Sequence, residues 1–363
     1  MTKVLFICGE LNLKTMTGGE LGTKNNFSIL ISVFGKENVK IFEVNSQPNF
    51  IQKKTNWLKN GHINASSQKI RNIDPNLKGI SLVFIDNSYL GNIAKYIKQK
   101  HPHIFIVSFF QNVEQDFARA AFHNKNKLTR FFIYTGVDRN ERNSCLYSDK
   151  IIVLNQRDNQ RIEMLYGRSA DLIMPINMPD ICPETTNATS LPPSNTAVFV
   201  GSFFFANING IQWFIDNVLD VVNIKLLIVG RRMEQLPLLI HRHPQITILS
   251  DVPDLSEIYQ EADFVVSPIF EGSGMKVKTC EALMYGKTII GTKEAFEGYN
   301  LSQSVAIECN TANEFISAIQ KYLNKEDRSK ANNEARTAFL EKYAQDIHIN
   351  KLRTFLQEKL PSL

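Results

Sequence analysis

Residues 267–286, SPIFEGSGMKVKTCEALMYG, place the end of a strand, a glycine turn and the start of a helix in one short stretch. The run DFVV at 263–266 is typical of a buried parallel strand, and Pro268 cannot extend the ladder of that strand. The glycines of 272–274 allow a tight turn, and 275–285 is rich in helix formers and ends at a glycine. A helix that starts after such a turn offers free N–H groups and a positive dipole end. The stretch therefore predicts an anion-binding strand, turn and helix.

This stretch resembles the donor site of retaining GT-B glycosyltransferases, the bacterial group 1 family (family 4 type), whose helix carries a Glu-Ala-hydrophobic-Met/Ala-x-Gly signature. Here the signature reads EALMYG at 281–286. The resemblance implies that Glu281 binds the nucleotide ribose. It also implies donor contacts from Gly272, Ser273, Gly274, Met275, Lys276, Val277 and Lys278. Ser273 stands where the usual pattern has a second glutamate. Two alternatives remain: the nearby Glu271 supplies the missing carboxylate, or the site has only Glu281. An ordinary strand, turn and helix without a ligand is the alternative.

The composition indicates two globular cores in a reducing compartment. The chain has 363 residues, 43% of them hydrophobic and 21% charged, which is enough for two α/β domains. Its five cysteines show neither metal-ligand spacing nor a pairing pattern. No apolar run approaches the length that spans a bilayer, and MTKVLFICGE at the N-terminus resembles a first strand more than a signal peptide. We expect a cytoplasmic protein, either free or peripheral on the inner face of the plasma membrane.

The two halves of the chain differ in charge. Residues 1–180 hold 24 Lys and Arg against 15 Asp and Glu, whereas 181–363 hold 17 against 21. A basic half favours an anionic partner such as a phospholipid surface or a lipid diphosphate, with a merely solvated lysine-rich surface as the alternative. Basic and apolar residues mix at 50–71, which suggests contact with an anionic membrane. No nucleic-acid partner is predicted, because the basic residues are spread and not interleaved with stacking aromatics.

Short β-rich runs alternate with helix-length segments, which predicts parallel sheets with crossover helices. The expected strands are 4–8, 39–44, 82–85, 104–109, 151–154, 197–200, 225–229, 246–249, 264–266, 288–290 and 305–307. The proline-rich composition of 175–196 suits a linker. We expect an acceptor-side domain over 1–176, a linker over 177–195 and a nucleotide-sugar-binding domain over 196–331. The resemblance implies two Rossmann-like domains that face each other across a cleft, with a C-terminal helix at 332–363 that packs back on the first.

Two features of the first half are candidates for the site. Gly18 and Gly19 precede a helical pattern at 24–34, so their backbone could approach a diphosphate closely. Gln111 follows the strand at 104–109 and stands where many relatives have histidine. Glutamine can orient hydroxyls but cannot titrate near neutral pH, so positioning is its expected catalytic contribution. A polar strand end without a catalytic role is the alternative for Gln111.

Strand ends in the second half supply the other candidates. In the family, cations near Gly201 hold the donor diphosphate, but this chain has Ser202 and Asn209 at those positions. Lys276, Lys278 or Arg231 is expected to replace them, with Lys276 preferred because it lies nearest the glycine turn. The resemblance also assigns donor contacts to Gly201, Ser202, Gly230, Arg231 and Val252.

The resemblance implies a glycosyltransferase that moves a sugar, with retention, from a nucleotide-sugar donor to a glycan or lipid-linked acceptor in bacterial surface polysaccharide synthesis, and the basic first half agrees with such an acceptor. Its expected catalytic residues are Gln111, Lys276 and Glu281. No metal or other cofactor is expected, since Asp-x-Asp is absent and His241 and His243 lack suitable companion ligands. A catalytically silent nucleotide-sugar-binding protein, or an epimerase or hydrolase of the same fold, is the alternative.

Overall fold

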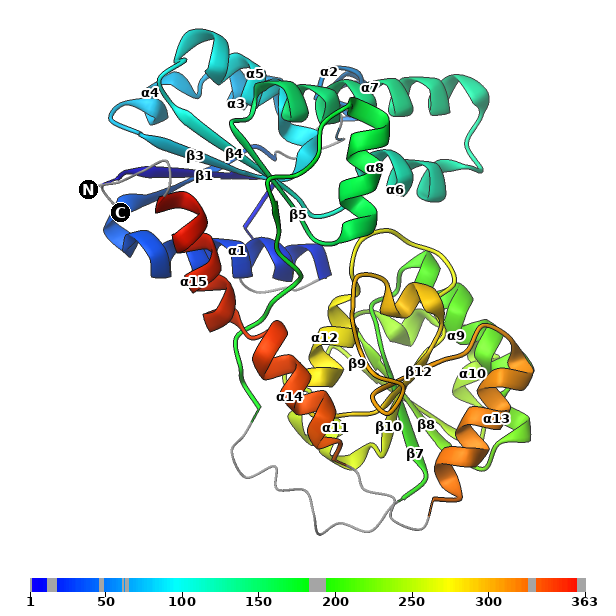
Figure 1. The fold of residues 1–363 in the computed structure, drawn as a ribbon. Coiled ribbons are helices and arrows are strands. Elements are labelled where there is room, and N and C mark those ends of the chain that lie inside the picture. The colour runs from blue at the N-terminus through cyan, green and yellow to red at the C-terminus, as the bar shows by residue number, and fades with distance from the viewer. Residues whose placement is uncertain are drawn as a thin grey trace. The chain divides into compact units, whose positions relative to one another are not determined.

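The computed structural model describes residues 2–11, 18–45, 49–60, 62, 65–182, 194–325 and 331–357. The chain divides into two compact units (Figure 1). Unit 1 comprises Met1–Asn177 with Gln345–Leu363, and unit 2 comprises Met178–Ala344. The linker expected over 177–195 lies largely outside the described residues, as do the last residues of the chain.

Unit 1 holds a parallel sheet in the order β2-β1-β3-β4-β5-β6. Its strands are β1 (Val4–Cys8), β2 (Val39–Glu43), β3 (Leu82–Asp86), β4 (Phe105–Phe110), β5 (Lys150–Val153) and β6 (Leu172–Ile173). Its helices are α1 (Gly18–Phe34), α2 (Phe50–Asn60), α3 (Ser67–Arg71), α4 (Asp74–Leu77), α5 (Gly91–Lys100), α6 (Glu114–Phe122), α7 (Lys127–Tyr147), α8 (Gln156–Tyr166) and α15 (Gln345–Gln357).

The inner strands β1 and β3 of the unit 1 sheet are buried on both faces. Leu5 and Ile7 pack with residues of α4 and α5, such as Leu77 and Ile93, in one apolar cluster. Phe6 points to the opposite face, where its ring lies 5.4 Å from that of Phe27 in α1. This alternation follows from the two-residue period of a strand, so both faces of β1 must be covered by helices.

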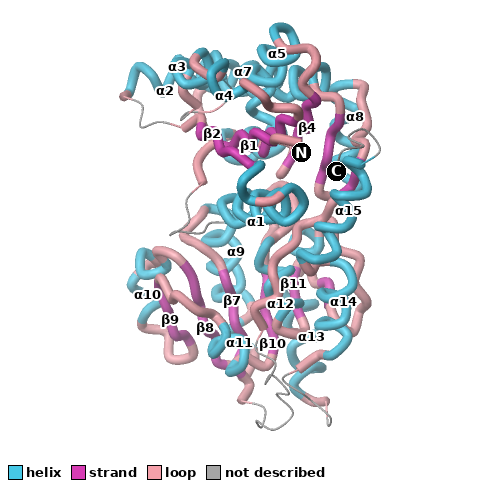
Figure 2. The backbone as a smooth tube through the Cα atoms, turned by 90° about the vertical axis from the view of Figure 1, so that its left-hand side faces the viewer, coloured by secondary structure: helices cyan, strands magenta, loops and turns pink. Residues whose placement is uncertain are grey.

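Unit 2 holds a second parallel sheet in the order β12-β11-β10-β7-β8-β9, and Figure 2 shows β9, β8, β7 and β10 side by side. Its strands are β7 (Thr196–Val200), β8 (Lys225–Gly230), β9 (Ile246–Ser250), β10 (Phe264–Ser267), β11 (Ile289–Gly291) and β12 (Ala306–Glu308). Its helices are α9 (Phe205–Asn217), α10 (Leu238–His241), α11 (Ser256–Glu261), α12 (Val277–Met284), the 3₁₀ helix η5 (Lys293–Phe296), α13 (Ala312–Leu323) and α14 (Asn333–Lys342).

The expected strands all form, with ends that differ by at most one residue. The structure adds β6, a two-residue strand without an apolar run long enough to predict it. The segment treated as one helix at 332–363 contains two helices, because the chain turns at 343–344. Of these, α14 belongs to unit 2 and α15 belongs to unit 1, where α15 packs on α1 and the Gln345 side chain contacts Asn25 and Ser28. Among the described helices, none is both long and apolar enough to cross a membrane.

Candidate active site

The candidate donor residues of unit 2 lie in loops that follow the carboxyl ends of parallel strands. In its sheet the chain reverses its direction of growth between β7 and β10. Open α/β sheets bind ligands in the crevice outside such a switch point. Gly230 ends β8, and Val277 begins α12. The loops after β7, β8, β9 and β10 carry Gly201, Ser202, Arg231, Val252 and residues 272–276.

Backbone contacts hold the loops after β7 and β8 together. The amide of Phe203 donates to the carbonyl of Arg231 at 2.9 Å. Gly230 has φ +151, and a Cβ atom there would lie 1.9 Å from the carbonyl oxygen of Gly201. Only glycine permits this approach at residue 230, so the two candidate glycines Gly201 and Gly230 pack on each other at this edge.

The glycine turn after β10 leaves a hydroxyl without a partner. Gly272 and Gly274 have φ values of +149 and +65, which allow the chain to reverse before α12. Between them, the buried Oγ atom of Ser273 has no hydrogen-bond partner among the described residues, and the same holds for Ser267 at the end of β10. Buried hydroxyls are normally hydrogen-bonded, so the missing partner of Ser273, which lies in the turn itself, is one that a ligand could supply.

Lys276 is held by its own turn and by η5. Its Nζ atom donates to the carbonyl of Gly274 at 2.8 Å and forms an ion pair with Glu294 at 2.7 Å. Both side chains are largely buried, with 12% and 19% of their surfaces exposed. Glu294 neutralises the charge of Lys276. Lys276, which the sequence favoured as the cation for the diphosphate, is therefore less available to bind an anion than Lys278.

Lys278 lies beside the loop after β7. Its Nζ atom donates to Oδ1 of Asn207 at 2.6 Å and lies 4.6 Å from the centre of the Phe199 ring. A Cβ atom on Gly201 would be only 3.0 Å from that Nζ atom. Burial, followed by the charge of Lys276, lowers the pKa of Lys278 to about 7, against the opposing effect of Glu281. An anion at this edge would favour the charged form of Lys278.

Glu281 lies in the second turn of α12, against α11. Its Oε2 atom accepts a hydrogen bond of 3.2 Å from the hydroxyl of Tyr259, whose ring stacks on Tyr285 at 4.5 Å. Burial raises the pKa of Glu281 to about 7, while the bond from Tyr259 and the charge of Lys278 lower it. The described residues give Oε1 of Glu281 no hydrogen bond, so this oxygen can accept from a ligand hydroxyl. Sequence reasoning missed Tyr259 and Asn207, because both reach the site from other helices.

A pocket of about 220 Å³ adjoins the glycine turn. The rings of Trp213 and Phe270 meet edge to face in it, with centres 4.6 Å apart. A Cβ atom on Gly210 would lie 1.9 Å from the carbonyl oxygen of Pro268, so the second turn of α9 packs closely against the chain after β10. This packing brings Asn209 and Glu271 into the lining of one pocket.

In unit 1 the structure brings Gln111 to the start of α1. Its Nε2 atom donates to Oγ1 of Thr23 and to Oδ2 of Asp86, each at 2.9 Å. Asp86 also accepts from Asn26 at 2.7 Å. Burial raises the pKa of Asp86, and the bonds from Thr23, Asn26 and Gln111 lower it. Sequence reasoning missed Asp86, although its place at the end of β3 is a signal for a site residue.

The predicted glycines of unit 1 lie in the first turn of α1. Gly18 begins the helix, and a Cβ atom on Gly19 would lie 3.8 Å from Oε1 of Gln111. The residues just before Gly18 are outside the described part of the chain. The structure therefore joins the two candidate features of the first half into one cluster.

A buried carboxylate from α7 supports the segment after Gln111. Glu141 accepts from the amides of Glu114 and Gln115 at 2.8 and 3.1 Å, which caps the start of α6. It also accepts from the hydroxyls of Ser88 and Tyr166 at 2.9 and 2.8 Å. Burial, followed by the charge of Glu114, raises the pKa of Glu141 to about 8. Glu141 thus ties the loops after β3 and β4 to α7 and α8.

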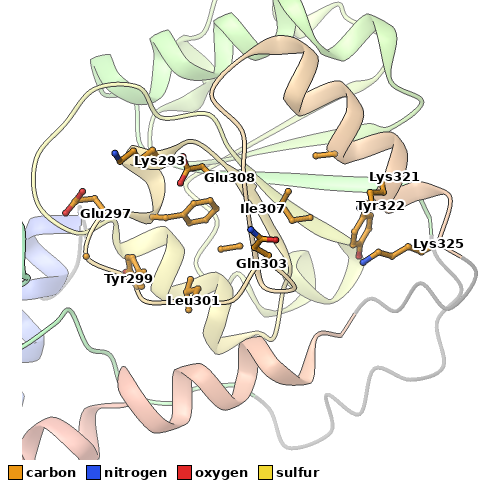
Figure 3. Close-up of a pocket in the computed structure, with 14 residues that line it drawn as sticks. Lys293, Glu297, Tyr299, Leu301, Gln303, Ile307, Glu308, Lys321, Tyr322 and Lys325 are labelled. Atoms are coloured by element: carbon orange, nitrogen blue, oxygen red, sulfur yellow. The ribbon is translucent and has the colours of Figure 1, made fainter.

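Another pocket, of about 660 Å³, lies along the edge strand β12 (Figure 3). Lys293 and Glu297 from η5 and the loop after it, Glu308 from β12 and Lys321 from α13 are among its lining. None of the candidate donor residues is among the residues that line it. Within the described ranges no three His, Cys, Asp or Glu side chains are grouped as metal ligands would be, and metal independence stays a prediction.

The family model described as Glycosyl transferases group 1 matches residues 194–325. The chain contains a group 1 glycosyltransferase domain. This match covers every candidate donor residue of unit 2, from Gly201 to Glu281. A comparison with curated protein sequences finds no match.

Solved structures establish the fold of this glycosyltransferase as GT-B. Sucrose-phosphate synthase from Thermosynechococcus elongatus is similar with a TM-score of 0.77 at 12% identity, over 100% of both chains. HepE from Anabaena, in complex with UDP and glucose, is similar with a TM-score of 0.69 at 13% identity, also over 100% of both. The trehalose-6-phosphate synthase OtsA has a TM-score of 0.65 at 10% identity, over 100% of this chain and 99% of that one. At these identities the likeness shows the fold alone.

Proposed function

We propose that this glycosyltransferase binds a nucleotide-sugar donor at the carboxyl edge of the unit 2 sheet and transfers the sugar with retention of configuration. The observation that carries the proposal is the grouping of the glycine turn, Lys278 and Glu281 beside the Gly201 loop. The complex of HepE with UDP and glucose supports this class of donor.

The side chains at this edge match the parts of a nucleotide sugar. Glu281 has two carboxylate oxygens, and a carboxylate can accept from two neighbouring hydroxyls such as those of a ribose. Lys278 and the amides at the start of α12 suit a diphosphate, because positive charge and a helix N-terminus both stabilise developing negative charge. The buried hydroxyl of Ser273 is free to bond a polar group of the donor.

In the proposed reaction the bond between the anomeric carbon and the diphosphate oxygen breaks, and a bond to the acceptor oxygen forms on the same face. The acceptor hydroxyl proton passes to the departing diphosphate, so no enzyme base is required. Lys278 neutralises the leaving group in this proposal. Lys276, paired with Glu294, holds the turn in shape.

Unit 1 is proposed to hold a glycan or lipid-linked acceptor of the kind used in surface polysaccharide synthesis, at an anionic membrane surface. The Gln111, Thr23 and Asp86 cluster offers amide, hydroxyl and carboxyl groups, which position a sugar hydroxyl through hydrogen bonds. The basic excess of residues 1–180 agrees with an anionic acceptor or surface.

Thermal stability of the protein with UDP-, GDP-, ADP- and TDP-sugars tests the donor, since a ligand of the folded state raises the apparent stability. For the donor that binds, we expect Glu281→Ala to weaken binding by about 10- to 100-fold, because hydrogen bonds to a charged group are lost. Glu257→Ala, which removes an exposed carboxylate at the start of α11, is the matched control.

Transfer of radiolabelled sugar to lipid extracts and glycans then tests the reaction, and the anomeric configuration of the product tests retention. Donor binding without transfer to any acceptor would point instead to a silent nucleotide-sugar-binding protein. Release of free sugar alone would indicate a hydrolase, and conversion of the donor would indicate an epimerase.

A further inference from the structure

The start of α7, next to its connection with α6, carries a group of exposed apolar side chains. Leu128, Phe131 and Phe132 are 67%, 62% and 37% exposed. Their spacing of three and four residues puts them on one face of the first turns of α7. Figure 1 shows this connection at the outer end of both helices, beyond the unit 1 sheet. We name residues 119–132 the α6–α7 tip.

The charge around the tip is of one sign. No Asp or Glu occurs between Asp116 and Asp138, and the cations in this interval are Arg119, Lys125, Lys127 and Arg130. Arg130 donates to the backbone carbonyl of His123, so its charge is held against the end of α6. Large apolar side chains flanked by cations are typical of segments that lie in the interface of an anionic bilayer.

Two other places in unit 1 with exposed apolar residues differ from the tip. The segment at 50–71, in which sequence reasoning placed a membrane contact, has its tryptophan half-buried, with the ring of Trp57 5.3 Å from that of Phe122. Ile51 stays 72% exposed. At the other end of α7, Leu146 is 65% exposed but follows a mixed-charge segment that contains Glu141 and Arg142. Among the side chains whose burial the structure describes at these three places, only those of the tip join several exposed apolar residues to a stretch free of acidic residues.

We propose that the α6–α7 tip inserts Leu128, Phe131 and Phe132 into the interface of an anionic bilayer while its lysines and arginines bind the lipid headgroups. The proposal rests on the proposed function only in so far as a lipid-linked acceptor gives this contact a use. A second copy of the chain is a poorer occupant, because a two-fold contact would bring the same cations of both copies together.

Sedimentation with vesicles tests this surface. We expect the protein to bind vesicles of phosphatidylcholine and phosphatidylglycerol in equal parts, and to bind phosphatidylcholine alone far more weakly. The variants Leu128→Ser and Phe131→Ser should each weaken binding about tenfold. Lys125→Gln and Lys127→Gln should each weaken it about fivefold. The control Leu146→Ser removes an equally exposed side chain from the same helix and should bind like the parent protein.

Two results would overturn the proposal: no binding of the parent protein to anionic vesicles, or equal losses for Leu146→Ser and the tip variants. A parent dimer in solution that Phe131→Ser converts to a monomer would assign the tip to a second copy instead. Donor affinity is measured on the same proteins. A tip variant that loses vesicle binding but keeps its donor affinity shows that the tip acts in membrane binding and not in donor binding. A parent protein that binds vesicles but binds no nucleotide sugar contradicts the proposed function and leaves the membrane proposal intact.

Discussion

The carboxyl edges of the two sheets have the same construction but different chemistry. In unit 1 the cluster around Gln111 consists of amide and hydroxyl groups with Asp86 as its one ionisable member. In unit 2 the corresponding edge gathers two lysines and Glu281 around a glycine turn. The first suits a neutral, hydroxyl-bearing ligand, and the second suits one with a diphosphate. A parallel sheet thus supplies the place of a site, and the side chains after each strand determine what it binds.

The backbone contact under the donor edge should give the largest effect. A methyl group on residue 230 would lie 1.9 Å from the carbonyl of Gly201, so Gly230→Ala should destabilise unit 2 by about 3 kcal/mol and abolish donor binding. Gly79 also has a positive φ, +74, but has nothing within 4 Å of its Cβ position, so Gly79→Ala should cost about 1 kcal/mol. Hydrogen exchange of the amides of each unit measures both changes, and equal costs for the two variants would contradict the steric argument.

The two lysines of the donor edge should differ in importance. Lys278→Met should lower kcat/KM about 100-fold, because it removes the cation proposed to face the leaving diphosphate. Lys276→Met should lower it only about tenfold, since that lysine is already paired with Glu294. Steady-state kinetics with the identified donor measures both losses. A larger loss for Lys276→Met than for Lys278→Met would make Lys276 the cation that faces the diphosphate.

The pH dependence of the same variants sharpens this contrast. The pKa of Lys278 is lowered to about 7, so kcat/KM of the parent should fall as pH rises through about 7, and the methionine variant should lose this limb. A lowered pKa contributes stability that is present above the unfolded value of 10.5 and lost as pH falls towards 7. Lys278→Met should therefore be more stable than the parent at and below neutral pH.

In unit 1 the buried Glu141 should matter for stability more than for donor binding. Glu141→Ala leaves the amides of Glu114 and Gln115 without an acceptor and should cost about 2 to 3 kcal/mol. Because the pKa of Glu141 is raised from 4.5 to about 8, its contribution is full below 4.5 and is lost as pH rises through 8. Glu141→Gln should flatten this decline. Thermal unfolding across pH measures it, and an unchanged profile would assign the decline to Glu114 or another group.

The smallest effect is expected at Gln111. Gln111→Ala should lower kcat/KM for the acceptor about tenfold and leave donor affinity unchanged, because its amide only positions a hydroxyl. The adjacent Asn112, whose amide donates to Glu114, offers the control Asn112→Ala, which should leave both quantities unchanged. Weaker donor binding in Gln111→Ala would show that the two edges do not divide the substrates in the way proposed.

Much of the fold could be predicted because its signals are local. Strands that are buried on both faces of a parallel sheet have mostly apolar sequences, so runs such as 4–8 and 225–229 are recognised as strands. Glycine turns mark where those strands end. β6 escaped prediction because two residues have no periodicity to detect. The turn that separates α14 from α15 also escaped, since both helices continue one apolar pattern.

The candidate site was predictable by position but not by pairing. The residues from Gly201 to Glu281 follow strand ends, which sequence patterns locate. The partners of Lys276, Lys278 and Glu281 come from η5, α9 and α11, and no local pattern links those segments to α12.

The sequence by itself determined two parallel sheets and a donor-type turn before α12, because strand period, helix propensity and glycine placement act over a few residues. Only the tertiary structure decided that Glu294 forms an ion pair with Lys276 and that Lys278 lies beside Gly201. Ion pairs and burial depend on side chains that are distant in sequence and are brought within a few ångströms only by the packed fold.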